Sequence, residues 1–176
     1  TSDDAYEGAE RFTLSASLAN GNADSDTATI LDDGSGVIYN DDGTVDPNGI
    51  PDDDRTLTVT GKDDISEGSN AIFTVTIEAA SSAPTVVNLD LGDAADTTED
   101  GDYSTSITAY YFDANGDRQA LTITNGSVTL PAGVASFVSV PTTSDDAYEG
   151  AERFTLSASL ANGNADSDTE IGRAHV

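Results

Sequence analysis

The chain has 176 residues and carries 33 acidic residues against six basic ones, which gives a formal net charge of −27. A balance this acidic argues against a protein that binds nucleic acid or an anionic membrane, because such proteins use Lys and Arg to neutralise phosphates. No apolar run approaches the roughly 18–20 residues of a membrane-spanning helix, so we expect no membrane insertion, and no basic, apolar signal segment opens the chain.

The composition favours a β-protein that uses Asp in its turns. The acidic residues are 25 Asp and eight Glu, and Cys, Met and Trp are absent. Asp is typical of turns and of cation sites with oxygen ligands, whereas an acidic helical protein would favour Glu. Without Cys the chain has no disulfide, thiolate metal site or cysteine nucleophile. Because 36% of the residues are apolar and sharply patterned, we expect a folded chain rather than a disordered one.

The chain opens with a segment that it later repeats. Residues 1–27, TSDDAYEGAERFTLSASLANGNADSDT, recur letter for letter at residues 143–169, which lie 142 positions downstream. Identity at surface positions as well as core positions indicates a recent tandem duplication. The sequence therefore predicts that residues 1–33 are the C-terminal part of an upstream repeat. We expect this part to form a separate two-stranded hairpin rather than to pair with strands of the downstream repeat.

Residues 34–55, GSGVIYNDDGTVDPNGIPDDDR, are polar, acidic and rich in turn residues, which is typical of a linker. Within it, the stretch from Asp46 to Asp54 resembles a shortened Asp-rich calcium repeat of extracellular linkers. Turns favour the same residue types, so both interpretations stay open.

Alternating apolar residues predict short strands through the rest of the chain. The expected inward-facing positions are Leu57 and Val59; Phe73, Val75 and Ile77; Val87, Leu89 and Leu91; and Phe154, Leu156, Ala158 and Leu160. Further runs lie at residues 107–112, 120–124, 127–130 and 135–140, with Asn-Gly turns between several of them. About seven strands over roughly 115 residues predict an all-β, seven-stranded antiparallel immunoglobulin-like sandwich at residues 56–169.

One short motif imitates a calcium loop. Residues 113–117, Asp-Ala-Asn-Gly-Asp, match the start of an EF-hand loop, but Arg118 and Thr124 stand where that loop needs Gly and Glu. We therefore interpret the motif as a hairpin turn through Asn115 and Gly116.

The densest acidic stretch lies just before the last alternating strand. Residues 145–154 read DDAYEGAERF and hold four carboxylates within eight residues, and residues 3–12 are their copy. Anions this close repel one another unless a cation neutralises them. Calcium takes six to eight oxygen ligands and suits such a loop better than zinc does. A solvated acidic turn explains the same spacing, so the spacing alone leaves both interpretations open.

Four motifs in order extend this picture. Ser66-Glu67-Gly68, then Gly101-Asp102-Tyr103, then the acidic stretch at residues 145–154, then a closing strand that ends in an Asp pair, resemble the Calx-beta domain. The resemblance covers residues 56–169, and residues 1–33 as part of a preceding copy. It implies a calcium-binding sandwich whose ligands would be Glu67, Asp102, Asp145, Asp146, Glu149 and Glu152, with Asp3, Asp4, Glu7, Glu10, Asp32 and Asp33 as the set of the upstream copy.

The chain departs from this pattern at its end. Residues 170–176 read EIGRAHV where the upstream copy continues ATILDDG. We interpret this tail as non-native sequence and give its His175 no role. Neither copy then holds the whole ligand set, because the upstream copy lacks counterparts of Glu67 and Asp102 and the downstream copy lacks the Asp pair.

These observations predict a function in binding and structure rather than catalysis. Carboxylates crowded in polar loops, with few aromatic residues and no nucleophile motif, do not suit an enzyme. We expect a calcium-binding structural repeat of an extracellular adhesin-like or secreted protein, in which calcium stiffens junctions with neighbouring repeats and other domains bind cell-surface or matrix ligands. The alternatives are a calcium-sensing module of a membrane transporter and a non-catalytic module of a secreted hydrolase.

Overall fold

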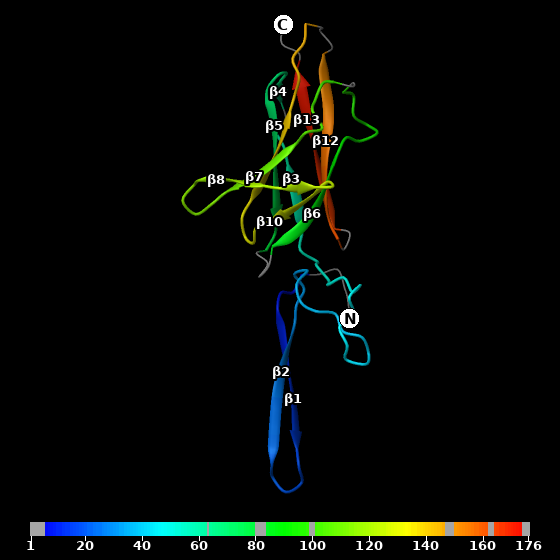
Figure 1. Ribbon diagram of the computed structural model, residues 1–176, viewed down its shortest axis with the longest axis vertical. Helices are drawn as coiled ribbons and strands as arrows, with labels where there is room; N and C mark the ends of the chain where they lie inside the picture. Colours follow the sequence, from blue (N-terminus) through cyan, green and yellow to red (C-terminus); the bar gives the residue numbers. More distant parts are fainter. Residues whose placement is uncertain are drawn as a thin grey trace. The chain divides into compact units, whose positions relative to one another are not determined.

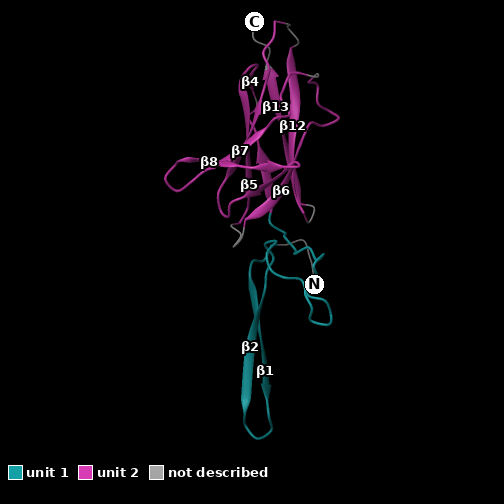
Figure 2. Ribbon diagram, in the orientation of Figure 1, with its two compact units in different colours: residues 1–55 teal, residues 56–176 magenta. Residues whose placement is uncertain are grey.

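A computed structural model describes residues 6–62, 64–79, 84–98, 101–146, 150–161 and 164–173 of the chain. In this part of the chain the regular structure is all β, and no helix is present that could cross a membrane. The chain divides into two compact units, residues 1–55 and residues 56–176 (Figure 1 and Figure 2).

Unit 1, residues 1–55, begins with an antiparallel hairpin of β1 (Glu10–Ser17) and β2 (Ala23–Ile30). Thr13 lies opposite Thr27, and the turn is closed by the Leu18 N–H, which donates to the Asn22 carbonyl at 2.8 Å. Since β2 pairs with β1, the prediction of a separate hairpin is confirmed. Both strands are exposed along their whole length.

The segment after the hairpin is ordered by Asp-capped turns. The Asp42 carboxylate accepts hydrogen bonds from the N–H and the hydroxyl of Thr44, and these bonds lower the pKa of Asp42. The Asp46 carboxylate accepts from the Asn48 N–H at 2.9 Å. These carboxylates act on neighbouring backbone as Asp does in turns, which agrees with the turn interpretation of residues 46–54.

Unit 2, residues 56–176, is built from two sheets. One sheet has the order β4-β13-β12-β6-β10-β9 and the other has the order β3-β5-β11-β7-β8 (Figure 1). The strands of the first sheet are β4 (Ile65–Ser66), β6 (Thr85–Leu91), β9 (Ile123–Thr124), β10 (Ser127–Leu130), β12 (Ala151–Leu160) and β13 (Ala165–Arg173). Those of the second are β3 (Leu57–Thr60), β5 (Asn70–Ile77), β7 (Thr108–Phe112), β8 (Arg118–Leu121) and β11 (Ser136–Pro141).

The predicted inward-facing residues form the core of unit 2. Phe73 and Val75 on β5, Val87 on β6, and Phe154 and Leu156 on β12 are each almost fully buried. They belong to one continuous apolar cluster that includes residues of both sheets. The alternation read from the sequence therefore identifies the face of each strand that packs into the core.

Two features of the sheets differ from the sequence-based expectation. The described residues of unit 2 form eleven strands rather than seven, because some predicted runs are split and short strands join the sheet edges. One ladder is parallel, between β4 and β13, where Ile65 lies opposite Gly172. The chain passes from β3 in one sheet to β4 in the other, and there β4 runs in the same direction as the last strand.

Acidic side chains of β13 cover the edge of β3. Asp166 accepts a hydrogen bond from the Val59 N–H at 2.8 Å, and Asp168 accepts one from the Gly61 N–H at 2.7 Å. Glu170 is fully buried and accepts from the Lys62 N–H. β3 ends the order of its sheet, so these carboxylates satisfy backbone donors that an edge strand would otherwise expose.

The strand does not stop where the repeated sequence stops. β13 continues through Arg173, and its last residues pair with β12, with Phe154 opposite Glu170 and Ala151 opposite Arg173. Because EIGRAHV stands where the upstream copy continues ATILDDG, the sequence predicts a poor closing strand here, and for residues 170–173 this prediction is wrong. Backbone pairing alone can extend a ladder, whatever side chains the residues carry.

The duplicated sequence gives a matched test of the core. Phe154 is 1% exposed and its copy Phe12 is 55% exposed. We expect Phe154→Ala to lower the free energy of unfolding of unit 2 by about 3–5 kcal/mol, because it leaves a cavity between the sheets. Phe12→Ala should leave that transition unchanged. Urea unfolding followed by circular dichroism measures both variants, and equal effects would contradict this packing.

The buried Glu170 gives a second test. Its counterpart in the upstream copy is Ala28, and removing a carboxylate from water is unfavourable even when one amide donates to it. We expect Glu170→Ala to raise the melting temperature of unit 2 by a few degrees, since Lys62 is an exposed residue and water can hydrogen-bond to its N–H in place of the carboxylate. Asp168→Ala is the control and should lower the melting temperature. A fall in both variants would show that the Glu170 hydrogen bond outweighs its desolvation.

Candidate functional site

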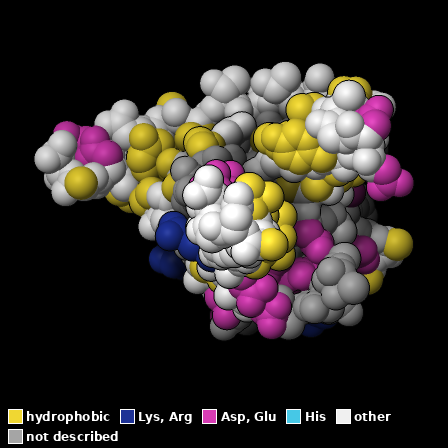
Figure 3. Space-filling view, turned by 90° about the horizontal axis from the view of Figure 1, so that it is seen from below, with side chains coloured by type: hydrophobic (Ala, Val, Ile, Leu, Met, Phe, Trp, Pro, Cys, Tyr) yellow, Lys and Arg dark blue, Asp and Glu magenta, His cyan; other side chains and the backbone are white. Residues whose placement is uncertain are grey.

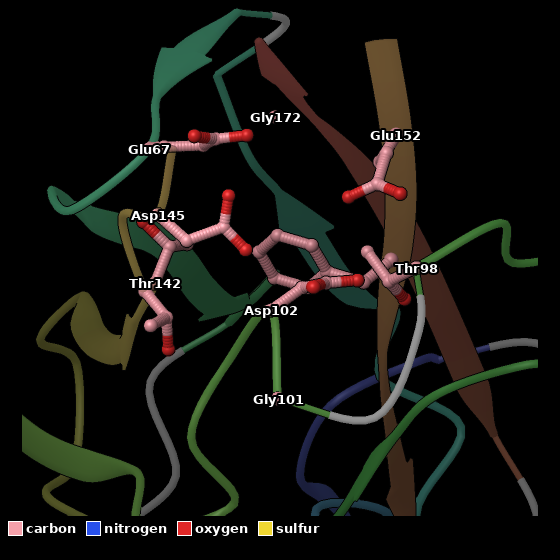
Figure 4. Close-up of a pocket in the computed structure, with 10 residues that line it drawn as sticks. Glu67, Thr98, Gly101, Asp102, Thr142, Asp145, Glu152 and Gly172 are labelled. Atoms are coloured by element: carbon pink, nitrogen blue, oxygen red, sulfur yellow. The ribbon is translucent and has the colours of Figure 1, made fainter. Parts of the chain in front are cut away.

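A pocket of about 140 Å³ in unit 2 gathers four of the predicted ligands. Figure 4 shows the side chains of Glu67, Asp102, Asp145 and Glu152 around one space, and they come from three parts of the chain. Its described lining consists of Glu67, Thr98, Gly101, Asp102, Thr142, Thr143, Asp145, Glu152, Phe154 and Gly172. Residues separated by up to 105 positions in the sequence, Glu67 and Gly172, thus meet at one site.

Backbone hydrogen bonds fasten three of these segments together. Thr142 donates from its N–H at 2.9 Å and from its hydroxyl at 2.8 Å to the Ser69 carbonyl, in the turn that carries Glu67. The Thr143 N–H donates to the Asp102 carbonyl at 2.7 Å. The segment that follows β11, and leads to Asp145, therefore holds the turn after β4 on one side and the Asp102 segment on the other.

The core forms one wall of the pocket. Phe154 lines the pocket. Its ring centroid lies 5.0 Å from that of Tyr103, with the rings stacked, and 6.0 Å from that of Phe73, in an edge-to-face arrangement. Such ring pairs are favourable geometries and fix the positions of their backbones. Since Tyr103 follows Asp102 and Phe154 lies two residues from Glu152, the aromatic packing also places two of the carboxylates.

The lining has the chemistry of a site for a hard cation. Glu67, Asp102 and Glu152 are half-buried and Asp145 is exposed, so their carboxylates surround a space that is partly withdrawn from water. Threonine hydroxyls and carboxylates supply only oxygen donors, which is the ligand type that Ca²⁺ takes. Four like charges around one pocket also make its potential strongly negative.

The four carboxylates do not form a closed coordination shell. Among the described residues, no group of three or more Asp, Glu, His or Cys side chains is close enough together to hold a metal ion. Asp146 is exposed and does not line the pocket. Glu149, Asp3 and Asp4 lie outside the described residues, so the structure offers no test of their part.

The upstream copy shows how the acidic loop and the closing Asp pair meet. The Asp32 carboxylate accepts a hydrogen bond from the Glu7 N–H at 2.8 Å, and Glu10 lies opposite Ile30 in the ladder. Asp33 accepts from the Ser35 N–H at 3.1 Å. Loop and Asp pair are thus neighbours at one end of the hairpin, although 25 residues separate Glu7 from Asp32.

In unit 2 the pocket lies at the end of the β12–β13 hairpin that corresponds to this end of β1–β2. Gly172 is the counterpart of Ile30, lies opposite Glu152 and lines the pocket. In a repeat that ended as the upstream copy does, the Asp pair would follow two residues after this position. The two copies therefore hold complementary parts of the ligand set that the motif resemblance implies.

Sequence reasoning missed the threonines of the site. Thr98, Thr142 and Thr143 line the pocket, and Thr142 also fastens it. Thr is frequent in the strands and loops of this chain alike, so its presence in a loop carries no signal until the fold places it.

The candidate EF-hand motif is a turn. The Asp113 carboxylate accepts hydrogen bonds from the Asp117 N–H at 3.0 Å, the Asn115 N–H at 2.9 Å and the Gln119 side-chain amide at 2.8 Å. These donors, the Asp117 N–H foremost, lower the pKa of Asp113. The motif connects β7 to β8, which confirms the hairpin interpretation.

Comparisons with known proteins give distant likenesses. No family model matches the chain, and no curated protein matches it. Among solved structures, two crystal structures of BcpA, the major pilin subunit of Bacillus cereus, are similar with 11% identity and TM-scores of 0.34 and 0.32, the first being that of a variant. The matches cover 79% and 89% of this chain but 47% and 51% of the pilin chains, so the chain spans about half of their length. We draw no functional inference from likenesses this distant.

The Asp113 turn predicts a pH dependence. Because the pKa of Asp113 is lowered from 3.8, its ionised form stabilises the folded state above that pH, and the stabilisation is lost as pH falls through the folded-state pKa. We expect Asp113→Asn to lower the melting temperature of unit 2 slightly at neutral pH and to match the parent in strong acid. Melting curves between pH 7 and pH 3 measure the difference, and a gap that widened on acidification would contradict this role.

Proposed function

We propose that unit 2 is a Calx-beta-like, calcium-binding structural repeat of an extracellular multidomain protein. The observation that supports this most strongly is the pocket that gathers Glu67, Asp102, Asp145 and Glu152. These are four of the six residues that the motif resemblance implies as ligands in the downstream copy. A solvated acidic turn would not require Glu67 and Asp102 to lie beside the stretch at residues 145–152.

Calcium would act here as a cross-link between segments. A divalent cation accepts oxygen ligands from several carboxylates at once and removes their mutual repulsion. Glu67, Asp102, Asp145 and Glu152 would hold it, with Glu149 from the same loop and a closing Asp pair where the repeat has one. Binding would draw the turn after β4, the Asp102 segment and the start of β12 toward one point and so stiffen this end of the sandwich.

The position of the Asp pair suggests what calcium does between repeats. In the upstream copy Asp32 and Asp33 follow β2 directly, and Asp33 forms an isolated bridge with Asp53 at the end of residues 34–55. A cation held by this pair would therefore restrain the start of the connecting segment. The partners of such a module are neighbouring repeats of the same protein, and calcium at extracellular concentrations would keep the array extended.

An acidic surface suits this role. Acidic side chains are spread over the face drawn in Figure 3, with exposed apolar groups beside them. At a net charge of −27, repulsion keeps such chains soluble and apart, and divalent cations screen it. We propose a location outside the cell or on its surface, where calcium is abundant and can cross-link a chain that has no Cys for disulfides.

Thermal unfolding with and without calcium tests the proposal. We expect millimolar CaCl₂ to raise the melting temperature of unit 2 relative to EDTA, because a ligand that binds only the folded state stabilises it. A second chain, with residues 170–175 changed to those of the upstream copy, restores the Asp pair through Ala174→Asp and His175→Asp. It should respond at lower calcium concentrations than the parent.

Matched variants locate the response. Asp145→Ala combined with Glu149→Ala should remove most of it, whereas Asp113→Ala should lower stability slightly and leave the calcium response intact. Magnesium at the same concentration controls for general charge screening. An unchanged midpoint in calcium for both the parent and the restored chain would refute the metal site.

A further inference from the structure

The two ends of the connecting segment, residues 34–55, meet each other. Asp33, which directly precedes the segment, forms an isolated antiparallel bridge with Asp53 near its end. Beside the bridge, the Gly34 N–H donates to the Asp52 carbonyl at 2.8 Å. Residues that face each other in an antiparallel pair have Cα atoms about 5 Å apart. The segment therefore forms a loop that returns to its starting point.

The loop also has contacts of its own between the two ends. Tyr39 forms a second antiparallel bridge with Val45, and the Asp46 N–H donates to the Ile38 carbonyl at 2.8 Å. Gly49 packs closely on this part, because a Cβ atom added to it would lie 2.5 Å from the Cβ of Ile38. The segment is thus a folded element, and the Asp33–Asp53 bridge is its base.

The base brings two acidic residues together. Like charges directly opposite each other in a strand pair are destabilising, and Asp53 is buried, where water screens charge poorly. The Arg55 guanidinium offsets this repulsion. Its Nε donates to Oδ1 of Asp53 at 2.7 Å and its Nη2 donates to Oδ2 at 2.5 Å. Asp53, first through its hydrogen bond, and Asp33, through its charge, raise the pKa of Arg55.

We propose that Arg55 is a built-in cation that closes the connecting segment at the Asp33–Asp53 bridge, and that the closed loop is a reserve of length released under tension. While the bridge is closed, the path from β2 to β3 crosses it and residues 34–52 add little to that path. Fully extended, these residues would add on the order of 60 Å. This inference goes beyond the proposed function and does not depend on calcium.

The bridge lies where tension along the chain would act. Asp33 follows β2 and Thr56 precedes β3, so a pull between these strands loads the bridge before it reaches the loop. The hydrogen bonds of an antiparallel pair are perpendicular to its strands, and pulling the two ends apart therefore breaks them one after another. We expect the loop to open at a lower force than the sandwich of unit 2, where whole ladders must be broken.

Force spectroscopy on the full chain tests the proposal. The chain has no cysteine, so T29C on β2 and T58C on β3, both at exposed positions, can each carry a DNA handle. Load then passes through the connecting segment. We expect an early extension step on the order of 60 Å, equal in CaCl₂ and in EDTA, before unit 2 unfolds. The later unfolding of unit 2 in the same trace verifies that each variant is folded.

Variants in the same background locate the closure. Arg55→Met leaves the facing acids without their cation, so the early step should be lost because the loop is already open at zero load. The double variant D53N/R55M removes the charge conflict together with the cation and should restore most of the step. Arg55→Lys should keep the step at a lower force, since Lys cannot form the two-point contact. Asp42→Asn, in a turn away from the base, should leave the step unchanged.

Four outcomes would overturn the proposal. Absence of an early step in the parent would show that the segment holds no releasable length. An unchanged step in R55M would show that Arg55 does not close the loop. Failure of D53N/R55M to restore a step lost in R55M would assign the closure to packing rather than to charge. A step seen in CaCl₂ and lost in EDTA would make a metal ion, and not Arg55, the cation at the base.

Discussion

The packing of the Phe154 ring is the contact on which both the core and the pocket of unit 2 depend. Phe154 on β12 meets Phe73 on β5, and these strands belong to different sheets, so the contact joins the two layers. The Phe154 ring also stacks on Tyr103, whose neighbour in the sequence, Asp102, lines the pocket. A single buried ring therefore contacts both sheets and fixes one wall of the acidic site. Because protein interiors are close-packed, neither arrangement can change without the other.

The acidic residues of this chain divide into two physical roles. Some carboxylates are used locally, as Asp42, Asp46 and Asp113 are in their turns, where each accepts hydrogen bonds from nearby N–H groups. Others are brought together from distant segments, as in the pocket or along the edge of β3. The first kind stabilises turns wherever it occurs. The second kind accumulates like charge at a place that the fold selects, and this is where a cation would have the greatest effect.

The duplicated hairpin shows that a β-hairpin and its place in a fold are separable. Identical residues form the same register and the same turn in both units. Among the residues that the structure describes, other strands cover the apolar face in unit 2 alone, where β6 lies beside β12 and β3 near β13. Local sequence is enough to pair the strands, since a short turn and alternating residues favour one register. Burial needs partners from elsewhere in the chain or from another molecule.

Much of the fold followed from local pattern. Alternation identified the strands and their inward faces, the exact repeat identified the hairpin, and turn chemistry identified the Asp113 loop. The pattern did not predict the parallel ladder of β4, because the side on which a short strand joins a sheet depends on where the chain crosses between layers. It did not predict the role of Asp166 and Asp168 either, since alternating acids on a strand look solvated until the edge of β3 lies beside them.

For the candidate site, the resemblance of four ordered motifs to a known domain family implied Glu67, Asp102, Asp145 and Glu152 as ligands. It could not show that they share one pocket, that Thr142 fastens their segments, or that Asp146 lies off the lining. Those facts depend on backbone hydrogen bonds and ring packing between residues far apart in the chain, which only the tertiary structure decides. Residue type determines which ligand a side chain can bind, whereas convergence is a property of the folded chain, because distances in space are set by packing and not by separation along the sequence.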